Sequence, residues 1–577
     1  MKRAKENQGA IHNKRIKHIW LFVALSFGVL LLRATYIQLI PGAAQSLRSI
    51  ARHQYQSQFD LASYRGNIYD HQRVPLAISI RSPSIAINPR KLDLSEKQIK
   101  RLAEILDLKE EKVRQLASKN SYFAWLKRQA SQQAAEEVKK MNLPGVHFLL
   151  EPARYYPGGS AAAPLIGYVG IDNTGLIGLE LKYNGLLHGE STKVLRMKDA
   201  RGQQILLSPD LAEPEKPGNN LVLTIDRAIQ EIAEEALAKG MSNSLAKRGF
   251  VVVGDPHTGR ILAMANSPSF NPNDSERVQI ENTANLTTNW RFEPGSILKP
   301  FIVALALQSG KVTPYGLHNC EKSGRLRIDR KSVIHDEHPK EFLTTEEVLV
   351  HSSNICIYKI ASLLGKEAVA EGLRSFGFAA PSPAIEFPGA VSGELSAWQK
   401  WREIRFSNIA FGQGLLVTGM EIIRAYGALA NGGAVINPYL VEKIETPSGK
   451  IVQDFSSEQL GRPIASDTAK IMRHVLARVV SEGTGRQANA PSYFTAGKTG
   501  TSEKVDPQTH AYSKEMWVAS FVGFAPVDDP HIVVLVVLDE PQKKSHFGGV
   551  WAAPVFSEIS ESTLKYLNVS AQKVAHG

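Results

Sequence analysis

The pattern of apolar and polar residues divides this chain into an apolar N-terminal run, a mixed middle and a long C-terminal region. Between residues 19 and 40 apolar residues follow one another almost without interruption. A helix over these residues would extend about 33 Å at ~1.5 Å per residue, enough to cross a bilayer. We therefore predict a basic tail at 1–18 and a transmembrane anchor at 19–40.

The charges before this span set its orientation. The tail holds one acid, Glu6, among the basic residues Lys2, Arg3, Lys5, Lys14, Arg15 and Lys17. The positive-inside rule then places the N-terminus in the cytoplasm and exports the rest. A cleaved signal peptide is the alternative, because Gly42-Ala43-Ala44 resembles a cleavage site. Arg33 is costly in lipid, which favours a partner helix beside the span.

The middle of the chain, residues 41–213, shows short helical periods without a catalytic pattern. Amphipathic helices are predicted at 95–106, 110–117 and 131–141, with Ser95 and Ser131 as N-caps. A stretch rich in Pro and Gly at 213–219 is the best linker by composition. It separates this region from a C-terminal domain at 214–577.

Strand-like runs stand at both ends of the C-terminal region. After a strand at 220–225, capped into a helix by Asp226, one pair of strands is predicted at 249–253 and 260–265. A second pair is predicted at 516–524 and 531–538. The sequence between the pairs reads as helical. We predict an α/β fold in which one antiparallel sheet, built from both ends, carries a helical insertion.

Candidate chemistry begins within that insertion. Pro294-Gly295 predicts a turn that leads into the apolar helix 301–307, and Ser296 and Lys299 stand three residues apart at its start. This spacing puts both side chains on one face, so the lysine amine can approach the serine hydroxyl. A desolvated lysine can accept the proton of a serine nucleophile. By itself, S-x-x-K is a weak signal.

Two further motifs follow in order, Ser352-Ser353-Asn354 and Lys498-Thr499-Gly500-Thr501. S-x-x-K, S-x-N and K-T-G together are typical of penicillin-binding proteins and class A β-lactamases. With these motifs the chain resembles a class B penicillin-binding protein, a peptidoglycan D,D-transpeptidase. The other stretches that carry the resemblance are 65–77, 154–159, 255–265 and 548–556. Residues 71–74 depart from the Arg-x-Gly-x that is usual in this family, so the resemblance does not establish the geometry of the turn there. No glycosyltransferase domain is expected before the region at 41–213.

The resemblance implies a transpeptidase fold behind an extended α+β pedestal, and a role for each motif residue. Ser296 would attack the carbonyl between two terminal D-alanines, with Lys299 as base. Ser352 would relay a proton and Asn354 would position Lys299 and substrate. The substrate carboxylate would bind at Lys498, Thr499, Gly500 and Thr501. The backbone amides of Ser296 and Thr501 would form an oxyanion hole. Lys299 is expected to be a cleft lysine with little core packing.

Composition adds two points. A net charge of +12 is compatible with a nucleic-acid-binding protein. The sequence has no basic-aromatic module and no zinc-ligand spacing that would support this function. The only cysteines are Cys320 and Cys356, too few for a disulfide framework. A single disulfide between these two cysteines is one alternative. The helix-like run around Cys356 favours the other, a buried free thiol. Residues 335–338 (His-Asp-Glu-His) have side chains that could bind a metal ion. Four adjacent loop residues rarely converge on one ion, so we predict no metal and no cofactor.

The resemblance also implies a cellular setting. Residues 75–80, 86–89 and 416–418 and the threonine of K-T-G are similar to the division-specific branch, whereas Gly412-Gln413-Gly414 also fits the elongation branch. The expected place is the bacterial inner membrane, single-pass, with the catalytic domain in the periplasm. Expected partners are stem peptides of lipid II-derived strands, β-lactams, a SEDS-family glycosyltransferase and other divisome proteins. The alternatives are a side-wall transpeptidase, a β-lactam sensor and a β-lactamase. A β-lactamase needs a base for rapid deacylation, and this chain has no E-x-x-L-N-like element between Asn354 and Lys498. Stem chemistry and oligomeric state stay open.

Overall fold

The computed structural model describes residues 2–39, 56–61, 63–190, 192–198, 204–205, 216–330, 332–381, 385–543 and 545–573. The chain forms two compact units, Met1–Ala62 with Glu190–Lys216 and Ser63–Gly189 with Pro217–Gly577. The domain boundaries predicted from the sequence, 1–18, 19–40, 41–213 and 214–577, remain predictions. Of the predicted linker, residues 213–215 lie outside the described residues.

The first unit contains a long helix and a small sheet. Helix α1 (Lys2–Leu39) includes the stretch Asn13–Gln38, which is long and apolar enough to cross a membrane. By length and composition this stretch fits a membrane anchor or a signal sequence. Residue 40 and the small residues at 42–44 lie outside the described residues. The sheet pairs β6 (Thr192–Lys198) antiparallel with β1 (Gln56–Leu61) and β7 (Gln204–Ile205).

A five-stranded antiparallel sheet with the order β10-β9-β21-β20-β19 lies in the second unit. Its strands are β9 (Arg248–Gly254), β10 (Ile261–Ser267), β19 (Ala496–Val505), β20 (Tyr512–Ala525) and β21 (Ile532–Asp539). The predicted sheet built from both ends of the C-terminal region is therefore confirmed.

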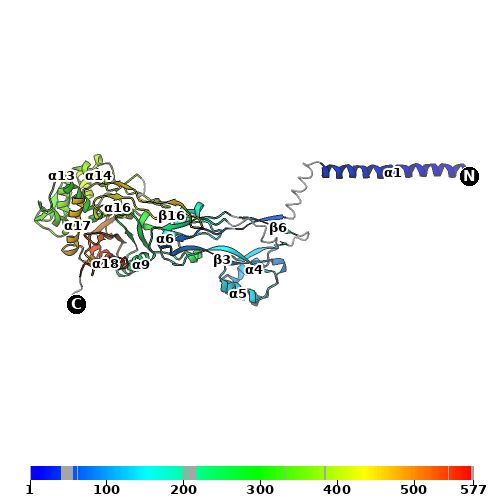
Figure 1. The fold of residues 1–577 in the computed structure, drawn as a ribbon, viewed down its shortest axis with the longest axis horizontal. Helices are drawn as coiled ribbons and strands as arrows, with labels where there is room; N and C mark the ends of the chain where they lie inside the picture. The colour runs from blue at the N-terminus through cyan, green and yellow to red at the C-terminus, as the bar shows by residue number, and fades with distance from the viewer. Residues whose placement is uncertain are drawn as a thin grey trace. The chain divides into compact units, whose positions relative to one another are not determined.

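Helices cover both faces of this sheet, and for this reason its strands read as nearly continuous apolar runs. One face is covered by α9 (Arg227–Ser244) and α18 (Gly548–Tyr566), and the core beneath them contains Val251. The neighbouring residue Phe250 belongs to the core on the other face. The helices of that face include α11 (Lys299–Gln308), α16 (Gly419–Ala430) and α17 (Ser466–Ser481). Figure 1 shows α9 beside α18.

The N-terminal part of the second unit is a ribbon with small helices. Strand β3 (Pro75–Ile87) pairs antiparallel with β5 (Val146–Tyr155) from Ile78 to Ile87. The helices are α3 (Glu96–Leu106), α4 (Glu110–Ala117) and α5 (Gln132–Lys140), and Figure 1 shows α4 and α5 near β3. Ser95 accepts a hydrogen bond from Gln98 N, and Ser131 from Ala134 N, so both predicted N-caps are confirmed.

A second sheet joins this ribbon to the C-terminal region, with the order β17-β16-β8-β2-β3-β4. Its other strands are β2 (Ile68–Tyr69), β4 (Ala124–Lys127), β8 (Asn220–Leu223), β16 (Val441–Glu445) and β17 (Ile451–Asp454). The strand predicted at 220–225 thus ends at Leu223 and lies in this sheet. Asp226 caps α9, as predicted, by accepting from Ala228 N and Ile229 N.

The turn before β3 contains a residue with a left-handed backbone conformation, although the sequence has no glycine there. Arg73 has a φ of +65°, and its N–H donates to Asp70 O over 3.1 Å. An L-residue in this region costs about 1–2 kcal/mol. The Arg73 guanidinium lies 2.6 Å from Glu445 Oε1, a contact that helps to hold the strained residue.

The two cysteines are joined, which corrects the expectation of a free thiol. Cys320 and Cys356 form a disulfide across 36 residues, and both side chains are fully buried. The bridge ties the end of β11 (Leu317–Asn319) to the start of α13 (Asn354–Leu364). The helix-like run at Cys356 did not reveal its partner, because Cys320 stands 36 residues earlier in the chain.

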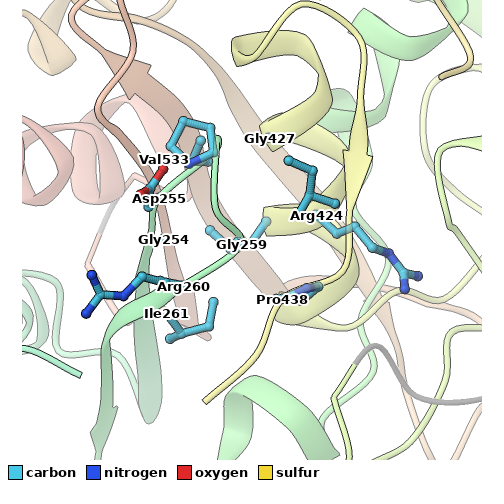
Figure 2. Close-up of a pocket in the computed structure, with 12 residues that line it drawn as sticks. Gly254, Asp255, Gly259, Arg260, Ile261, Arg424, Gly427, Pro438 and Val533 are labelled. Carbon is cyan, nitrogen blue, oxygen red and sulfur yellow. The ribbon is translucent and has the colours of Figure 1, made fainter. Parts of the chain in front are cut away.

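A small cavity lies between the β9–β10 turn and α16. It is lined by Asp255, Gly259 and Arg424 among others, which Figure 2 labels. Its volume of about 10 Å³ leaves room for little more than a water molecule. Arg424 is held by Gly377 O and by Asn437 Oδ1 at 3.2 Å. This cavity is too small for a ligand site.

The remaining elements of the second unit are short. They are α6 (Ala163–Ile166), α7 (Gly178–Lys182), α8 (Asn184–Leu187), α10 (Leu286–Asn289), β11 (Leu317–Asn319), β12 (Arg325–Arg327), β13 (Val333–His335), β14 (Phe342–Thr344), α12 (Thr345–Val350), α13 (Asn354–Leu364), α14 (Lys366–Ser375), α15 (Glu403–Ala410), β15 (Val435–Ile436) and β18 (Gln459–Gly461).

Candidate active site

Ser296 lies in a 3-10 turn, η5 (Gly295–Leu298), directly before α11. Gly295 has a φ of +57°, and a Cβ added there would lie 2.6 Å from Thr501 O. Only glycine fits this approach between the turn and β19. Pro300 stands in the first turn of α11, where its missing N–H costs nothing. The predicted turn and helix are both present.

Lys299 is fully buried, so the expectation of a cleft lysine with little packing is wrong. Its Nζ donates to Ser352 O over 2.6 Å, to Ser352 Oγ over 3.2 Å and to Asn354 Oδ1 over 2.7 Å. These three acceptors compensate an amine that has lost its water. They also direct the amine toward the turn at 352–354.

The Ser296 hydroxyl connects to Lys299 through Ser352. Ser352 Oγ donates to Ser296 Oγ over 3.1 Å and itself receives a hydrogen bond from Lys299 Nζ over 3.2 Å. Within the described residues, no hydrogen bond joins Lys299 Nζ directly to Ser296 Oγ. The approach of lysine to serine expected from their spacing therefore takes a route through a second hydroxyl.

Burial also changes the proton affinity of this lysine. Desolvation lowers the pKa of Lys299 to about 8, against the opposing effect of the nearby carboxylates of Asp336 and Glu337. Desolvation, together with the neighbouring charge of Lys299, holds the pKa of Lys498 well below its usual range. Two buried amines thus lie in one region, and both hold a proton less strongly than an exposed lysine does.

The turn that carries Ser352 is strained and firmly held. Ser352 has a φ of +58°, in the left-handed region. Ser353 then caps α13 by accepting from Cys356 N over 3.0 Å. A left-handed residue between α12 and α13 re-aims the chain so that Ser352 and Asn354 both reach Lys299.

Asp336 holds this turn, and sequence reasoning missed it. Its carboxylate accepts from Asn354 N over 2.5 Å, Ile355 N over 3.1 Å and Ser353 Oγ over 2.5 Å. A carboxylate on the first N–H groups of a helix is favoured by the helix dipole. Sequence reasoning considered this residue only as part of a metal cluster, and no group of metal-ligating residues occurs among the described residues.

Strand β19 forms another wall. Thr499 and Thr501 line the cleft; Thr499 Oγ1 lies 2.8 Å from Thr484 Oγ1, and Thr501 Oγ1 accepts from Gly548 N over 3.3 Å. Lys498 is fully buried beside them, with Nζ 3.3 Å from Thr499 Oγ1. A Cβ on Gly500 would lie 2.2 Å from Ser520 Oγ, so glycine is required there.

These residues surround one cleft of about 670 Å³. The cleft is lined by Ser296, Ser352, Asn354, Thr499 and Thr501, together with the aromatic side chains of Phe411, Trp517 and Phe547. Lys299 and Lys498 lie buried beside these lining residues. A hydroxyl chain to a buried amine, next to two threonines and a second buried amine, fits acylation of a serine by a substrate that carries a carboxylate.

Known proteins share this architecture. Residues 249–561 match the family described as the penicillin binding protein transpeptidase domain, and residues 60–223 the penicillin-binding protein dimerisation domain. PenA of Neisseria meningitidis, a probable peptidoglycan D,D-transpeptidase, is 32% identical over 97% of this chain and 94% of its own length. The peptidoglycan D,D-transpeptidase FtsI of Escherichia coli is 30% identical over 90% of this chain and 86% of its own length.

A solved structure agrees in fold. Penicillin-binding protein 3 of Mycobacterium tuberculosis, crystallised with aztreonam, superposes with a TM-score of 0.68 at 24% identity, covering 89% of this chain and 98% of the other. This likeness confirms the mixed α/β fold. The family matches and the two relatives confirm the resemblance stated from the sequence motifs. The chain belongs to the penicillin-binding proteins and is a class B peptidoglycan D,D-transpeptidase, with a dimerisation domain followed by a transpeptidase domain.

Proposed function

We propose that Ser296 is the nucleophile of this transpeptidase. Its Oγ attacks the carbonyl between the two terminal D-alanines of a stem peptide, and an ester to the penultimate alanine forms as the terminal alanine leaves. The amine of a neighbouring stem then attacks this ester and regenerates the serine. The observation that carries the proposal is the hydrogen-bond chain from Ser296 Oγ through Ser352 Oγ to Lys299 Nζ, with contacts of 3.1 and 3.2 Å.

Lys299 acts as the base in this scheme. Neutral Lys299 accepts the serine proton by way of Ser352, and Ser352 then passes a proton to the leaving amine. Asn354 holds the Lys299 amine in place from the other side, at 2.7 Å. A pKa near 8 supports the role, because a useful fraction of the amine is then neutral at physiological pH.

The substrate carboxylate binds beside β19. Thr499 and Thr501 offer hydroxyls at the cleft wall, and the buried amine of Lys498 lies behind them. Gly500 lets the strand approach the Ser296 turn. The backbone amides of Ser296 and Thr501 form the oxyanion hole, where each donor contributes ~3 kcal/mol to the transition state.

Labelling with benzylpenicillin tests the nucleophile. The intact mass of the wild type should rise by one adduct, and Ser296→Ala should show no rise. Persistence of the adduct separates a transpeptidase from a β-lactamase, because rapid loss with turnover of free drug would identify a hydrolase. Labelling of Ser296→Ala at the wild-type rate would refute the assignment.

The cellular role we propose is cross-linking at the division septum. Support comes from the division-branch resemblance of residues 75–80 and 86–89 and from the similarity to FtsI at 30% identity. In this role the N-terminal span and the pedestal dock on a SEDS-family polymerase that supplies the strands. Depletion should give long filaments without septa. Round or swollen cells would assign the protein to side-wall growth instead.

The N-terminal helix is proposed as an uncleaved anchor in the bacterial inner membrane, with the catalytic domain outside the cytoplasm. The basic residues before it support this orientation. Sequencing the N-terminus of the mature protein decides between the two possibilities. A start near residue 45 would identify a signal peptide and overturn the anchor.

A further inference from the structure

Glu503 continues the row of cleft-lining side chains on β19. Alternate residues of a strand face the same side, so Glu503 follows Thr499 and Thr501 on the cleft face, and all three line the cleft. At ~3.3 Å per residue, Glu503 stands about 7 Å from Thr501 and about 13 Å from Thr499 along the strand. It is the acidic member of this row.

The surroundings of Glu503 leave its charge available. Glu503 pairs across the ladder with Trp517, whose ring stacks on His546 at 4.1 Å between centroids. In the part of the chain that the structure describes, Glu503 forms no salt bridge. Partial burial raises the pKa of the Glu503 carboxyl, and the nearby His546 and Lys514 oppose this shift. A bound cation would favour the charged form further.

The reaction itself supplies a cation of the right kind. Cross-linking consumes an amine on the acceptor stem, and donor and acceptor stems are built from the same precursor, so a donor stem also carries that amine. An extended peptide whose terminal carboxylate lies between Thr499 and Thr501 places its third residue from the end about 7 Å along the strand. A side-chain ammonium on that residue then reaches the neighbourhood of Glu503.

We propose that Glu503 binds the free side-chain ammonium of the donor stem peptide and so selects donors that still carry it. This inference rests on the proposed placement of the donor carboxylate at Thr499 and Thr501. The other charged or titratable residues that line the cleft are His335, Asp336, Glu337, His338 and His351, from segments outside β19. Of these, Glu337 is the alternative cation-binding carboxylate, because Asp336 already accepts hydrogen bonds from three groups.

Three penicillins that differ at one carbon of the side chain provide the probe. Ampicillin carries an ammonium there, carbenicillin a carboxylate, and benzylpenicillin only hydrogen. The second-order rate constant of acylation is measured for each drug with the full-length protein in detergent. The variants are Glu503→Gln, which removes the charge, Glu503→Arg, which reverses it, and Glu337→Gln. Glu458→Gln, an exposed carboxylate that does not line the cleft, is the matched charge control.

We expect Glu503→Gln to lower the ratio of ampicillin to carbenicillin rate constants about threefold to tenfold, the range for partly exposed charge pairs acting on both drugs. Glu503→Arg should lower the ratio further, since its effect on the ring carboxylate common to all three drugs cancels in the ratio, and Glu458→Gln should leave the ratio unchanged. An unchanged ratio in both Glu503 variants, or a ratio that responds to Glu337→Gln instead, would overturn the inference. Loss of acylation by all three drugs in the wild type would instead contradict the proposed transpeptidase site.

Discussion

Lys299 Nζ lies 2.7 Å from Asn354 Oδ1, so a helix start and a turn 55 residues later hold one proton-accepting amine between them. The same amine donates to the backbone oxygen of Ser352 over 2.6 Å. Both acceptors belong to one turn, which fixes the amine beside the Ser352 hydroxyl that contacts Ser296. The geometry thus separates the base from the nucleophile by one relay group.

Acylation should depend on pH through Lys299. Because its pKa is lowered to about 8, the neutral form grows about tenfold per unit below pH 8 and saturates above it. We expect the rate constant for benzylpenicillin to rise in this way between pH 6 and pH 9. Lys498→Arg places a permanent charge beside Lys299, so the rise should persist in that variant and move to lower pH. A flat profile would rule out Lys299 as the base.

The free energy of unfolding should also depend on pH through Lys299, and it should increase as the pH rises. The folded pKa of Lys299, about 8, lies below the usual value of 10.5, so between these values the unfolded chain binds more protons. The cost of the buried ammonium is therefore complete below pH 8 and fades as pH rises toward 10.5. Relative to Lys299→Met, the wild type should gain ~3 kcal/mol between pH 7 and pH 10.5. Urea unfolding of both proteins at several pH values measures this difference in the free energy of unfolding. A difference that does not change with pH would disprove the lowered pKa of Lys299.

Asp336 should act as a positioning residue for the turn at 352–354. Asp336→Ala removes an N-terminal capping carboxylate from α13, which costs about 1–2 kcal/mol. Displacement of Ser352 and Asn354 should also slow acylation about tenfold to a hundredfold. Asp336→Asn keeps an acceptor but loses the charge that raises the pKa of Lys299. Its acylation profile should therefore move to lower pH.

A purely structural role for Asp336 would leave the pH profile of the Asn variant in place. Glu337→Gln is the neighbouring control, because Glu337 also raises the pKa of Lys299 without capping α13. We expect it to shift the profile in the same direction while stability stays unchanged. Equal profiles in all three proteins would contradict the electrostatic part of the argument.

Much of the fold followed from apolar runs and motif order. The strands around Val251 and Phe521 are apolar on both faces because helices cover both faces, and such runs are visible in any single sequence. The motif residues Ser296, Ser352 and Thr499 meet at one cleft, as their shared order predicted. Local signals such as the Ser95 cap were also sufficient, since a cap depends on residues three positions apart.

The features that escaped depend on contacts between distant segments. Asp336 reaches Asn354 from a loop, and its neighbours carry no periodic pattern that reveals the contact. The partner of Cys356 stands 36 residues earlier in the chain. Desolvation of Lys299 was expected, but its complete burial was not, because only the acceptors at 352–354 make complete burial of a lysine tolerable.

The disulfide should contribute to stability without taking part in the reaction. It closes a loop of 36 residues, for which chain entropy gives about 3–4 kcal/mol. The double variant Cys320→Ser with Cys356→Ser should unfold at lower temperature and still be acylated at 25 °C, because Asp336 continues to hold α13. Wild type treated with reductant under denaturing conditions and refolded is the control. An unchanged melting temperature would show that the bridge adds nothing.

Gly295→Ala should damage the site while leaving the fold in place. The added Cβ would lie 2.6 Å from Thr501 O, and φ at this position is +57°. The turn must therefore move away from β19, which displaces the Ser296 amide relative to the Thr501 amide across the proposed oxyanion hole. We expect acylation by benzylpenicillin to fall about a hundredfold, the usual loss for one misplaced donor, with a small change in melting temperature. Gly310→Ala, also at positive φ but with open space around it, is the matched control and should be acylated at the wild-type rate. Equal rates for the two variants would mean that the spacing between Ser296 and Thr501 does not limit acylation.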